Sequence, residues 1–406
     1  MDGSRAAYGR LSAPFSGRGG LLWAVAAGWL AVLGMRFVLP ALLPQVRAAF
    51  DLGNTGAGAV VSVVWATYAV MQFPAGALVD RIGERRLLAG STLAAATGVG
   101  VIAVAPSLLP FVLGCAVFGL GTGLFGPPRA TVLSRAFGEN DGAAFGVVLG
   151  AGSVGAALLP AGATYLAARA GWRVAFALAV PAYLLLGAAL WFAVPPRERT
   201  AAGRALRADA GRVGREVRRR PVVIGVLGIG LMLFVFQGLS AFLPTYLVSV
   251  KGLAATTAGT LFALLFLVGA AAQSAAGRLA DRLGHGRVLV ATTAASVLPL
   301  AVLPLVEGVA ALAVVSAAMG VRLAVAPVSN AYIVEVLADD VEGTAWGLLR
   351  TGFFVVGSTG SVAVGYLADS GLFDAAFLGL AGLTVVAALC YARLPDREAA
   401  SASGAG

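Results

Sequence analysis

Four arginines lie inside long apolar stretches of this chain: Arg36, Arg129, Arg322 and Arg350. An arginine at such depth in a bilayer is costly and normally faces a cavity, a partner or backbone carbonyls. Guanidinium groups also bind carboxylate and phosphate through paired hydrogen bonds. The first six apolar stretches contain no acidic residue, so Arg36 has no acid nearby in sequence. The pattern favours binding of an anion.

The alternative is a structural or gating role for these arginines. Arg350 lies near one end of its stretch, so we expect it to serve structure, with Glu335 as its partner. Polar and aromatic side chains accompany the other arginines, and each is more often a helix-packing contact than a ligand contact. The candidate substrate-binding residues are Arg36, Arg129, Arg322, Tyr68, Gln72, Gln237 and Asn330.

The frame G-x-x-x-D-R-x-G occurs twice, each time after an apolar segment, and the two copies lie 201 positions apart. Glycines permit close backbone approach and tight turns, and an aspartate can face the positive end of another helix. Such a contact can form in one conformation and break in another, so the frame predicts a gate. The candidate gating residues are Gly76, Asp80, Arg81, Gly83 and Arg86, followed by Gly277, Asp281, Arg282, Gly284 and Arg287.

The same offset relates residues outside the frame. Gly58 corresponds to Gly259 and Gly119 to Gly320, while Gln237 takes the place of Arg36. A period this long is typical of two structural halves of one membrane domain, as in duplicated transporters.

The composition agrees with a membrane protein. Hydrophobic residues make up 59% and charged residues 12%, with a mean hydropathy of +0.90. Stretches long enough to cross a hydrocarbon core of about 30 Å begin near Leu21, Gly58, Leu87, Phe111, Ala143, Val174, Val222, Ala254, Val288, Gly308, Thr344 and Phe373. We therefore predict an all-α membrane protein of about twelve transmembrane helices in two pseudo-symmetric halves.

Arginines concentrate in the loops on one side, which by the orientation rule is cytoplasmic. Both termini are then cytoplasmic, and we expect a multi-pass protein of the cell membrane. The formal charge of +10 is explained by these loops and by anionic headgroups, not by nucleic acid. Cys115 and Cys390 fall inside apolar stretches and imply no disulfide.

The predicted organisation follows from these boundaries. It comprises a cytoplasmic tail (1–20), a six-helix half (21–195), an arginine-rich cytoplasmic linker (196–221), a second six-helix half (222–393) and a cytoplasmic tail (394–406). The linker is expected to be a solvated segment that touches headgroups.

Both copies of the G-x-x-x-D-R-x-G frame match the loop signature of the major facilitator superfamily. The chain resembles this family over about Leu21 to Tyr391. This resemblance implies alternating access, with spans one, four, seven and ten around a central cavity and the loop aspartates and arginines locking the cytoplasmic ends. The stretch Arg36 to Pro44, with Tyr68-x-x-x-Gln72-x-Pro74-x-Gly76, resembles the organic-anion and anion:cation symporters. Thr122 stands where many of those have a glutamate, which argues against simple proton coupling through that span.

The direction of transport can be judged from span five. Drug:proton antiporters typically carry G-P-x-x-G-G there, whereas this chain reads Gly150-Ala-Gly-Ser-Val-Gly155-Ala-Ala-Leu-Leu-Pro160. Uptake of a small organic anion is therefore favoured. The alternatives are efflux of amphipathic or drug-like compounds by ion antiport, and a non-transporting membrane sensor on the same fold.

Enzyme chemistry is not expected. The single histidine, His285, lies in a loop, and the sequence contains no metal-ligand cluster or paired membrane carboxylates. We expect no catalytic residue, cofactor or metal. The expected partners are an anionic small molecule, a proton or sodium ion for coupling, and the lipid bilayer, and we expect a monomer.

Overall fold

The computed structural model describes residues 18–138, 141–196, 210–337 and 342–394, and all regular structure within them is helical. The elements are α2 (Gly19–Phe50), α3 (Asn54–Ile82), α4 (Glu84–Val104), α5 (Leu108–Gly123), α6 (Gly126–Phe137), α7 (Asp141–Ala170), α8 (Trp172–Ala177), α9 (Ala179–Ala193), α10 (Ala210–Glu216), α11 (Arg220–Ser249), α12 (Ala255–Leu283), α13 (His285–Ala295), α14 (Val297–Val302), η3 (Leu303–Leu305), α15 (Val309–Met319), η4 (Gly320–Ala324), α16 (Val325–Val336), α17 (Glu342–Ser358), α18 (Gly360–Asp369) and α19 (Phe373–Tyr391).

Among the described residues, twelve helices or runs of helices are long and apolar enough to cross a membrane. This confirms the predicted all-α architecture with twelve spans. Several spans are interrupted rather than continuous. In span four, α5 ends at Gly123 and α6 begins at Gly126, followed by Pro127 and Pro128. Proline has no N–H to donate, so the helix can break there.

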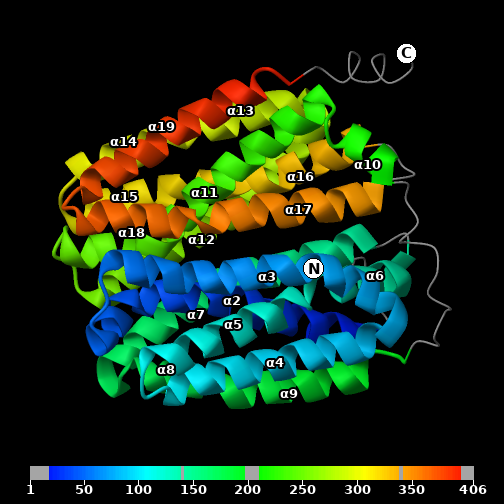
Figure 1. Cartoon of the computed structure of the whole chain (residues 1–406), viewed down its shortest axis with the longest axis horizontal. Coiled ribbons are helices and arrows are strands. Elements are labelled where there is room, and N and C mark those ends of the chain that lie inside the picture. The colour runs from blue at the N-terminus through cyan, green and yellow to red at the C-terminus, as the bar shows by residue number, and fades with distance from the viewer. Residues whose placement is uncertain (1–17, 139–140, 197–209, 338–341, 395–406) are drawn as a thin grey trace, which may run out of the picture.

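The helices form two layers (Figure 1). Elements α2 to α9 make the N-terminal half, and α11 to α19 make the C-terminal half. We call the end where α9 stops and α11 starts the linker end. The far end is the opposite one, where α2 stops at Phe50 and α3 starts at Asn54.

Two glycines let the halves meet closely on the far-end side. A Cβ atom at Gly58 of α3 would lie 2.3 Å from the carbonyl oxygen of Ser361 on α18. A Cβ atom at Gly259 of α12 would lie 2.4 Å from Oγ1 of Thr164 on α7. No residue with a side chain fits at these distances without a shift. The two contacts are pseudo-symmetric, because Gly58 and Gly259 are equivalent in the repeat.

The buried apolar residues show how the two halves share their packing. One core contains residues of both halves, including Phe37 of α2 and Phe262 of α12, whose ring centroids are 6.3 Å apart. The other core lies wholly in the linker and the C-terminal half and includes Val222 and Tyr391. The C-terminal half therefore has a linker-end core of its own.

Part of the predicted linker is ordered. Val213 of α10 is buried in the core of the C-terminal half, and Arg219 Nη1 donates to the carbonyl of Val336 at 3.2 Å. The described end of the linker thus packs against protein, which differs from the purely solvated segment predicted. An apolar side chain at position 213 supplies the reason, since its burial is favourable. The remainder of the linker, residues 197–209, and most of both tails lie outside the described residues.

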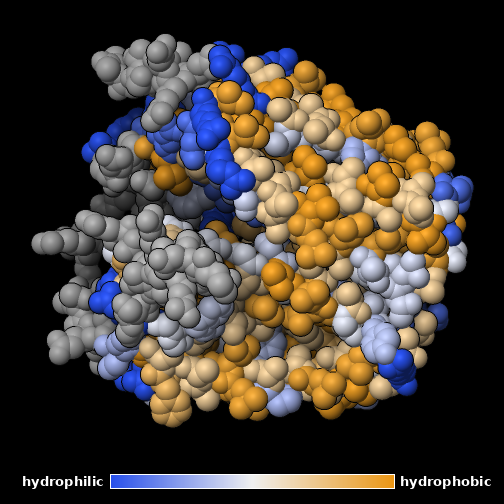
Figure 2. All heavy atoms as spheres, turned by 180° about the vertical axis from the view of Figure 1, so that it is seen from behind, coloured by the Kyte–Doolittle hydropathy of each residue, from blue (hydrophilic) through white to orange (hydrophobic). Residues whose placement is uncertain are grey.

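The surface has the distribution expected of a membrane protein. In Figure 2 hydrophobic residues cover much of the middle of this face, and hydrophilic residues gather toward its two ends. The surface is hollowed between the two halves near the linker end (Figure 2). The molecule is thus closed at the far end and open at the linker end.

Candidate functional site

Arg36 lies in the middle of α2 and is only 2% exposed. Its Cζ atom is 3.8 Å from the ring centroid of Tyr68 and 5.3 Å from that of Trp65, both on α3. The negative face of an aromatic ring attracts a cation, so these rings hold the guanidinium in place. Its Nε and Nη2 atoms are buried without a hydrogen-bond partner. Together they form a fork that matches the two oxygens of an oxyanion.

Arg129 approaches the same place from α6. It lies in the first turn after the break in span four, and its Cζ is 4.0 Å from the ring centroid of Trp29 on α2. Arg36 also contacts this ring, at 5.8 Å. The Nε and Nη1 atoms of Arg129 are buried and have no hydrogen-bond partner. The indole ring of Trp29 is thus shared by two cations.

A third arginine comes from the other half. Arg350 lies on α17, with Cζ 5.7 Å from the ring centroid of Phe354. Phe354 in turn contacts Tyr68, with ring centroids 5.5 Å apart. Arg350 interacts electrostatically with Tyr68 and with Arg129, and its Nε is buried without a partner. We call Arg36, Arg129 and Arg350 the arginine cluster.

The described residues provide no acid to this cluster. The charged or polar groups that interact with Arg36 and Arg129 are tyrosines and the other arginines. Glu335, expected as the partner of Arg350, instead pairs with His285, whose Nδ1 is 3.1 Å from Glu335 Oε2. No Arg350–Glu335 ion pair is seen among the described residues, and the structural role expected for Arg350 stays a prediction. Three like charges in a membrane interior are costly unless an anion is bound.

Arg322 is placed differently from the cluster. It lies in η4, where span ten is interrupted, and its Nη2 donates to the carbonyl of Met232 on α11 at 3.1 Å. Its Cζ is 5.6 Å from the ring centroid of Phe236, also on α11. Its Nε and Nη1 are buried without partners. The sequence grouped Arg322 with Arg36 and Arg129, whereas the structure brings Arg350 to them.

Of the remaining predicted binding residues, Gln72 is hydrogen-bonded within the protein, whereas Gln237 and Asn330 have buried polar atoms without partners. Gln72 donates to the carbonyl of Gly123 at 3.1 Å and so holds α3 against α5. Gln237 is fully buried, and neither its amide nitrogen nor its amide oxygen has a partner. Asn330 likewise has a buried side-chain oxygen without a partner. Gln237 and Asn330 are the repeat equivalents of Arg36 and Arg129, so neutral amides stand where the other half has cations.

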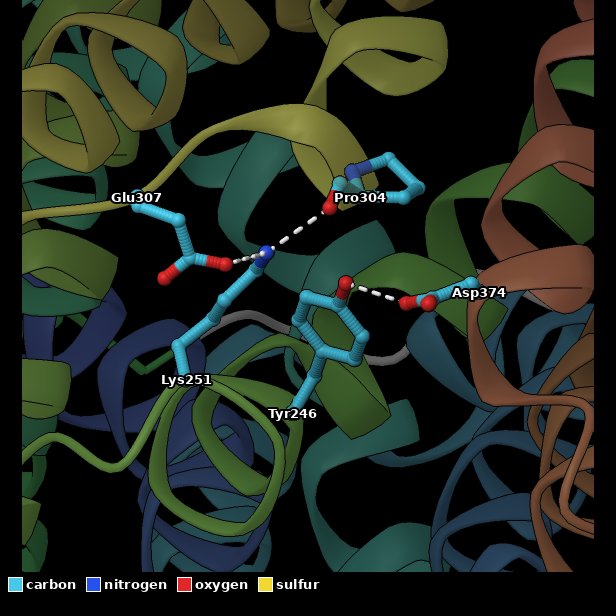
Figure 3. A network of polar contacts seen from close by, with 5 residues as sticks. All are labelled: Tyr246, Lys251, Pro304, Glu307 and Asp374. Carbon is cyan, nitrogen blue, oxygen red and sulfur yellow. Dashed lines mark hydrogen bonds and ion pairs between the residues drawn. The ribbon is translucent and has the colours of Figure 1, made fainter.

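Tyr246 of α11 belongs to a separate polar network at the far end. Its hydroxyl donates to Asp374 at 2.5 Å, and beside it Lys251 Nζ contacts Glu307 at 3.1 Å and donates to the Pro304 carbonyl at 2.8 Å (Figure 3). This network joins α11 and the residues just after it to η3, to the segment that follows η3 and to the start of α19. It ties the C-terminal half together at the far end.

The two loop frames lie at the linker end. Gly83 and Gly284 have φ of 83° and 87°, a conformation that favours glycine, so the predicted turns are present. Gly76 and Gly277 have open space where a Cβ would stand. The close backbone approach predicted at these two glycines is therefore absent in this conformation, because the halves are apart at this end.

The charged members of the frames agree with an open linker end. Arg81, Arg86, Asp281, Arg282 and Arg287 are exposed. Within the described part of the chain, none of these five forms an ion pair. The side chain of Asp80 lies outside the described residues. The gating roles predicted for these residues therefore stay predictions.

Each half has one acid–base pair next to its frame. In the N-terminal half, Glu84 is fully buried at the start of α4 and pairs with Arg135 of α6 at 3.1 Å. In the C-terminal half, His285 at the start of α13 pairs with Glu335 of α16. His285 is the repeat equivalent of Glu84. The second frame thus keeps an acid–base contact to span ten, with the acid and the base exchanged between the two helices.

Comparison with known proteins now places this architecture. The family model of the Major Facilitator Superfamily matches residues 24–321 and 251–406. The chain belongs to the major facilitator superfamily. Its fold and family are those of transporters, so it is a multi-pass membrane protein with a small-molecule substrate.

Individual proteins resemble the chain to different extents. The protein named "Probable sulfoacetate transporter SauU" of Cupriavidus necator is 26% identical over 85% of this chain and 86% of its own. The "Uncharacterized transporter YgaY" of Escherichia coli O157:H7 is 31% identical, but the match spans 44% of its length. A crystal structure of a bacterial homologue of the human lysosomal transporter Spinster, inward-facing and occupied, has a TM-score of 0.76 and 16% identity, covering 92% of this chain and 96% of that one.

Proposed function

We propose that this member of the superfamily is a secondary active transporter that works by alternating access and takes up a small organic anion. The observation that carries the proposal is the arginine cluster. Arg36, Arg129 and Arg350 present buried N–H groups without partners, and the described residues offer them no acid. A buried cation without a counter-charge is costly, so a ligand that brings an oxyanion removes that cost.

The likeness to SauU supports the same class of substrate. Its name gives sulfoacetate, which carries a sulfonate and a carboxylate. Two negative charges on a small molecule suit a site in which three guanidinium groups interact. Uptake remains the favoured direction of transport because the G-P-x-x-G-G motif of drug:proton antiporters is absent from span five.

Each candidate residue has a proposed role. Arg36 and Arg129 bind one oxyanion group from the N-terminal half, and Arg350 reaches it from the C-terminal half. Gln237, Asn330 and Arg322 hydrogen-bond the rest of the substrate, because each carries buried polar atoms without partners. Tyr68 positions Arg36 through its ring. A proton or sodium gradient is proposed to supply energy.

We propose further that the linker end faces the cytoplasm and that the protein resides in the cell membrane. The basic residues that follow the apolar spans gather at that end, as the orientation rule requires. In this orientation the structure is open to the cytoplasm. The loop residues, including Asp80 and Asp281, then act in closing that end during the transport cycle.

The test uses purified protein with radiolabelled sulfoacetate as the probe, and measures affinity and folded yield separately. Arg36→Gln copies the amide of the other half and should weaken binding by roughly 30-fold or more, the range for loss of one partner of a buried charge pair. Arg36→Lys should keep weak binding through its point charge but lose the fork geometry. Arg393→Gln, an exposed arginine of the linker end, is the matched control and should bind normally.

Three results would count against the proposal. An unchanged affinity in Arg36→Gln, with a lower folded yield, would make Arg36 structural. Extrusion of the cationic dye ethidium by proteoliposomes that do not transport sulfoacetate would favour drug efflux. Binding of sulfoacetate without flux, under both a proton and a sodium gradient, would favour a sensor.

A further inference from the structure

We infer that the transporter exchanges anions, because its empty site resists closure at the linker end and a bound anion permits it. This inference rests on the proposed function, since it takes an anion as the substrate. It concerns the transport mode: in an exchanger the gradient of the second anion drives uptake, in place of the proton or sodium gradient, because the carrier does not return empty.

The cluster places like charges on the two moving parts. Arg36 and Arg129 belong to the N-terminal half, whereas Arg350 belongs to the C-terminal half. Arg129 interacts electrostatically with both of the others. Like charges repel, and the repulsion is stronger in a medium of low dielectric than in water. The repulsion therefore acts between the halves.

The depth of these residues makes the repulsion sensitive to closure. Arg129 lies eight residues before the end of α6 at Phe137, and Arg350 lies eight residues after the start of α17 at Glu342. At a rise of about 1.5 Å per residue, both lie roughly 12 Å from the linker end of their helices. Closing that end swings the halves together there. The approach brings Arg350 toward Arg129.

The repeat shows that the facing cations Arg129 and Arg350 occur only on α6 and α17 and not on the equivalent helices. The equivalent of Arg350 in the N-terminal half is Leu149, and the equivalent of Arg129 in the C-terminal half is Asn330. The cross-half repulsion is therefore not duplicated by the pseudo-symmetry. It arises on one side of the central path only, where α3 and α17 meet through Tyr68 and Phe354.

The described residues hold no acid that could replace the departing substrate as a counter-charge. After an anion leaves toward the linker end, the cluster again carries three uncompensated cations. The carrier then stays open at that end until another anion binds, and that second anion is carried outward. Uptake of one anion is thus linked to release of another, and empty return is slow.

The first experiment measures the conformation without any substrate. Nitroxide labels at Ile82 of α3 and Leu283 of α12, both exposed and equivalent in the repeat, report the width of the linker end in purified protein. Arg350→Gln should increase the closed population at least threefold in buffer without organic anions. Arg350→Lys, which keeps the charge, and Arg393→Gln, which removes an exposed charge outside the cluster, should match the unchanged protein.

The second experiment measures transport in proteoliposomes. Uptake of labelled sulfoacetate should be at least tenfold faster into vesicles preloaded with unlabelled sulfoacetate than into vesicles loaded with an uncharged sugar. In Arg350→Gln this ratio should fall toward one. Equal rates in the unchanged protein, or label distances that Arg350→Gln leaves unaltered, would overturn the inference. Failure to bind sulfoacetate would contradict the proposed function instead, while the label distances would still decide whether the cluster opposes closure.

Discussion

Asp369 at the end of α18 accepts hydrogen bonds from the backbone N–H and the side-chain amide of Asn54, at 2.6 and 3.0 Å. Its second carboxylate oxygen accepts from the backbone N–H and hydroxyl of Thr55, at 2.8 and 2.6 Å. The first N–H groups of a helix lack partners within it. Here the cap of α3 is supplied by the opposite half, and the repeat equivalent of Asp369 is Ala168, which cannot form it.

The cap should stabilise the state that is closed at the far end. Asp369→Ala removes it, and loss of a helix cap typically costs about 1 kcal/mol, which is about a fivefold change in a conformational equilibrium. We expect the far-end-open population to rise by that factor. Nitroxide labels at Leu109 and Ala310, exposed and equivalent positions of the far end, would measure it.

The control for this variant is Asp374→Ala at the same end. Asp374 binds Tyr246 within the C-terminal half, so its loss should lower thermal stability and leave the distance between the labels unchanged. If both variants opened the far end equally, the contact between Asp369 and Asn54 would not be what stabilises the closed far end.

A second prediction concerns close packing between the halves. Gly58→Ala places a methyl group 2.3 Å from the Ser361 carbonyl oxygen, and overpacking of this kind costs about 1–3 kcal/mol. The same far-end labels should report a wider separation. Gly56→Ala, on the same helix, meets Leu52 at an ordinary 3.6 Å and should leave the distance unchanged. A normal distance in Gly58→Ala would show that the halves have room to adjust.

The sequence predicted the fold well because its evidence was long-range and repeated. Apolar lengths defined twelve spans, and the fixed offset between Gly58 and Gly259 revealed two halves that the structure confirms. Arg350 was not grouped with Arg36 and Arg129 because sequence gives the depth of a residue in its helix but not the neighbour across the interface. Only the contact of α17 with α3, through Phe354 and Tyr68, reveals its place beside Arg129.

The positions of the two loop frames were predicted from the sequence, but the residues that pair with Glu84 and His285 beside them were not. Glu84 and His285 occupy equivalent positions, so the second frame lacks the acid of the first. The compensating acid, Glu335, is equivalent to Ser134, one residue from Arg135. A comparison of the two halves over spans three and four would have found this exchange.

The third prediction tests the topology. A cysteine at Asp51, which is exposed beyond α2, should react with an impermeant thiol reagent in intact cells, whereas one at Arg393 should react only after lysis. Lys251 is a poor position, since its side chain is 3% exposed and pairs with Glu307. Arg207 of the linker, another position for a cytoplasmic cysteine, lies outside the described residues. Labelling of Arg393 but not Asp51 in intact cells would invert the orientation.

The last prediction compares the Glu84–Arg135 pair with the His285–Glu335 pair. Glu84 is fully buried, although its partner Arg135 is 42% exposed, whereas His285 and Glu335 are 26% and 33% exposed. Removal of a buried charge leaves unsatisfied neighbours, while exposed ion pairs contribute only up to about 1 kcal/mol. Glu84→Gln should therefore lower the thermal midpoint of the purified protein more than Glu335→Gln does.

Salt should separate the two cases further. Screening weakens exposed pairs more than buried ones. In buffer acidic enough to protonate His285, raising the ionic strength should therefore shrink the effect of Glu335→Gln and largely preserve that of Glu84→Gln. Equal losses of stability in both variants, with equal sensitivity to salt, would mean that burial does not distinguish the pairs. The two halves would then be equally dependent on their linker-end contacts.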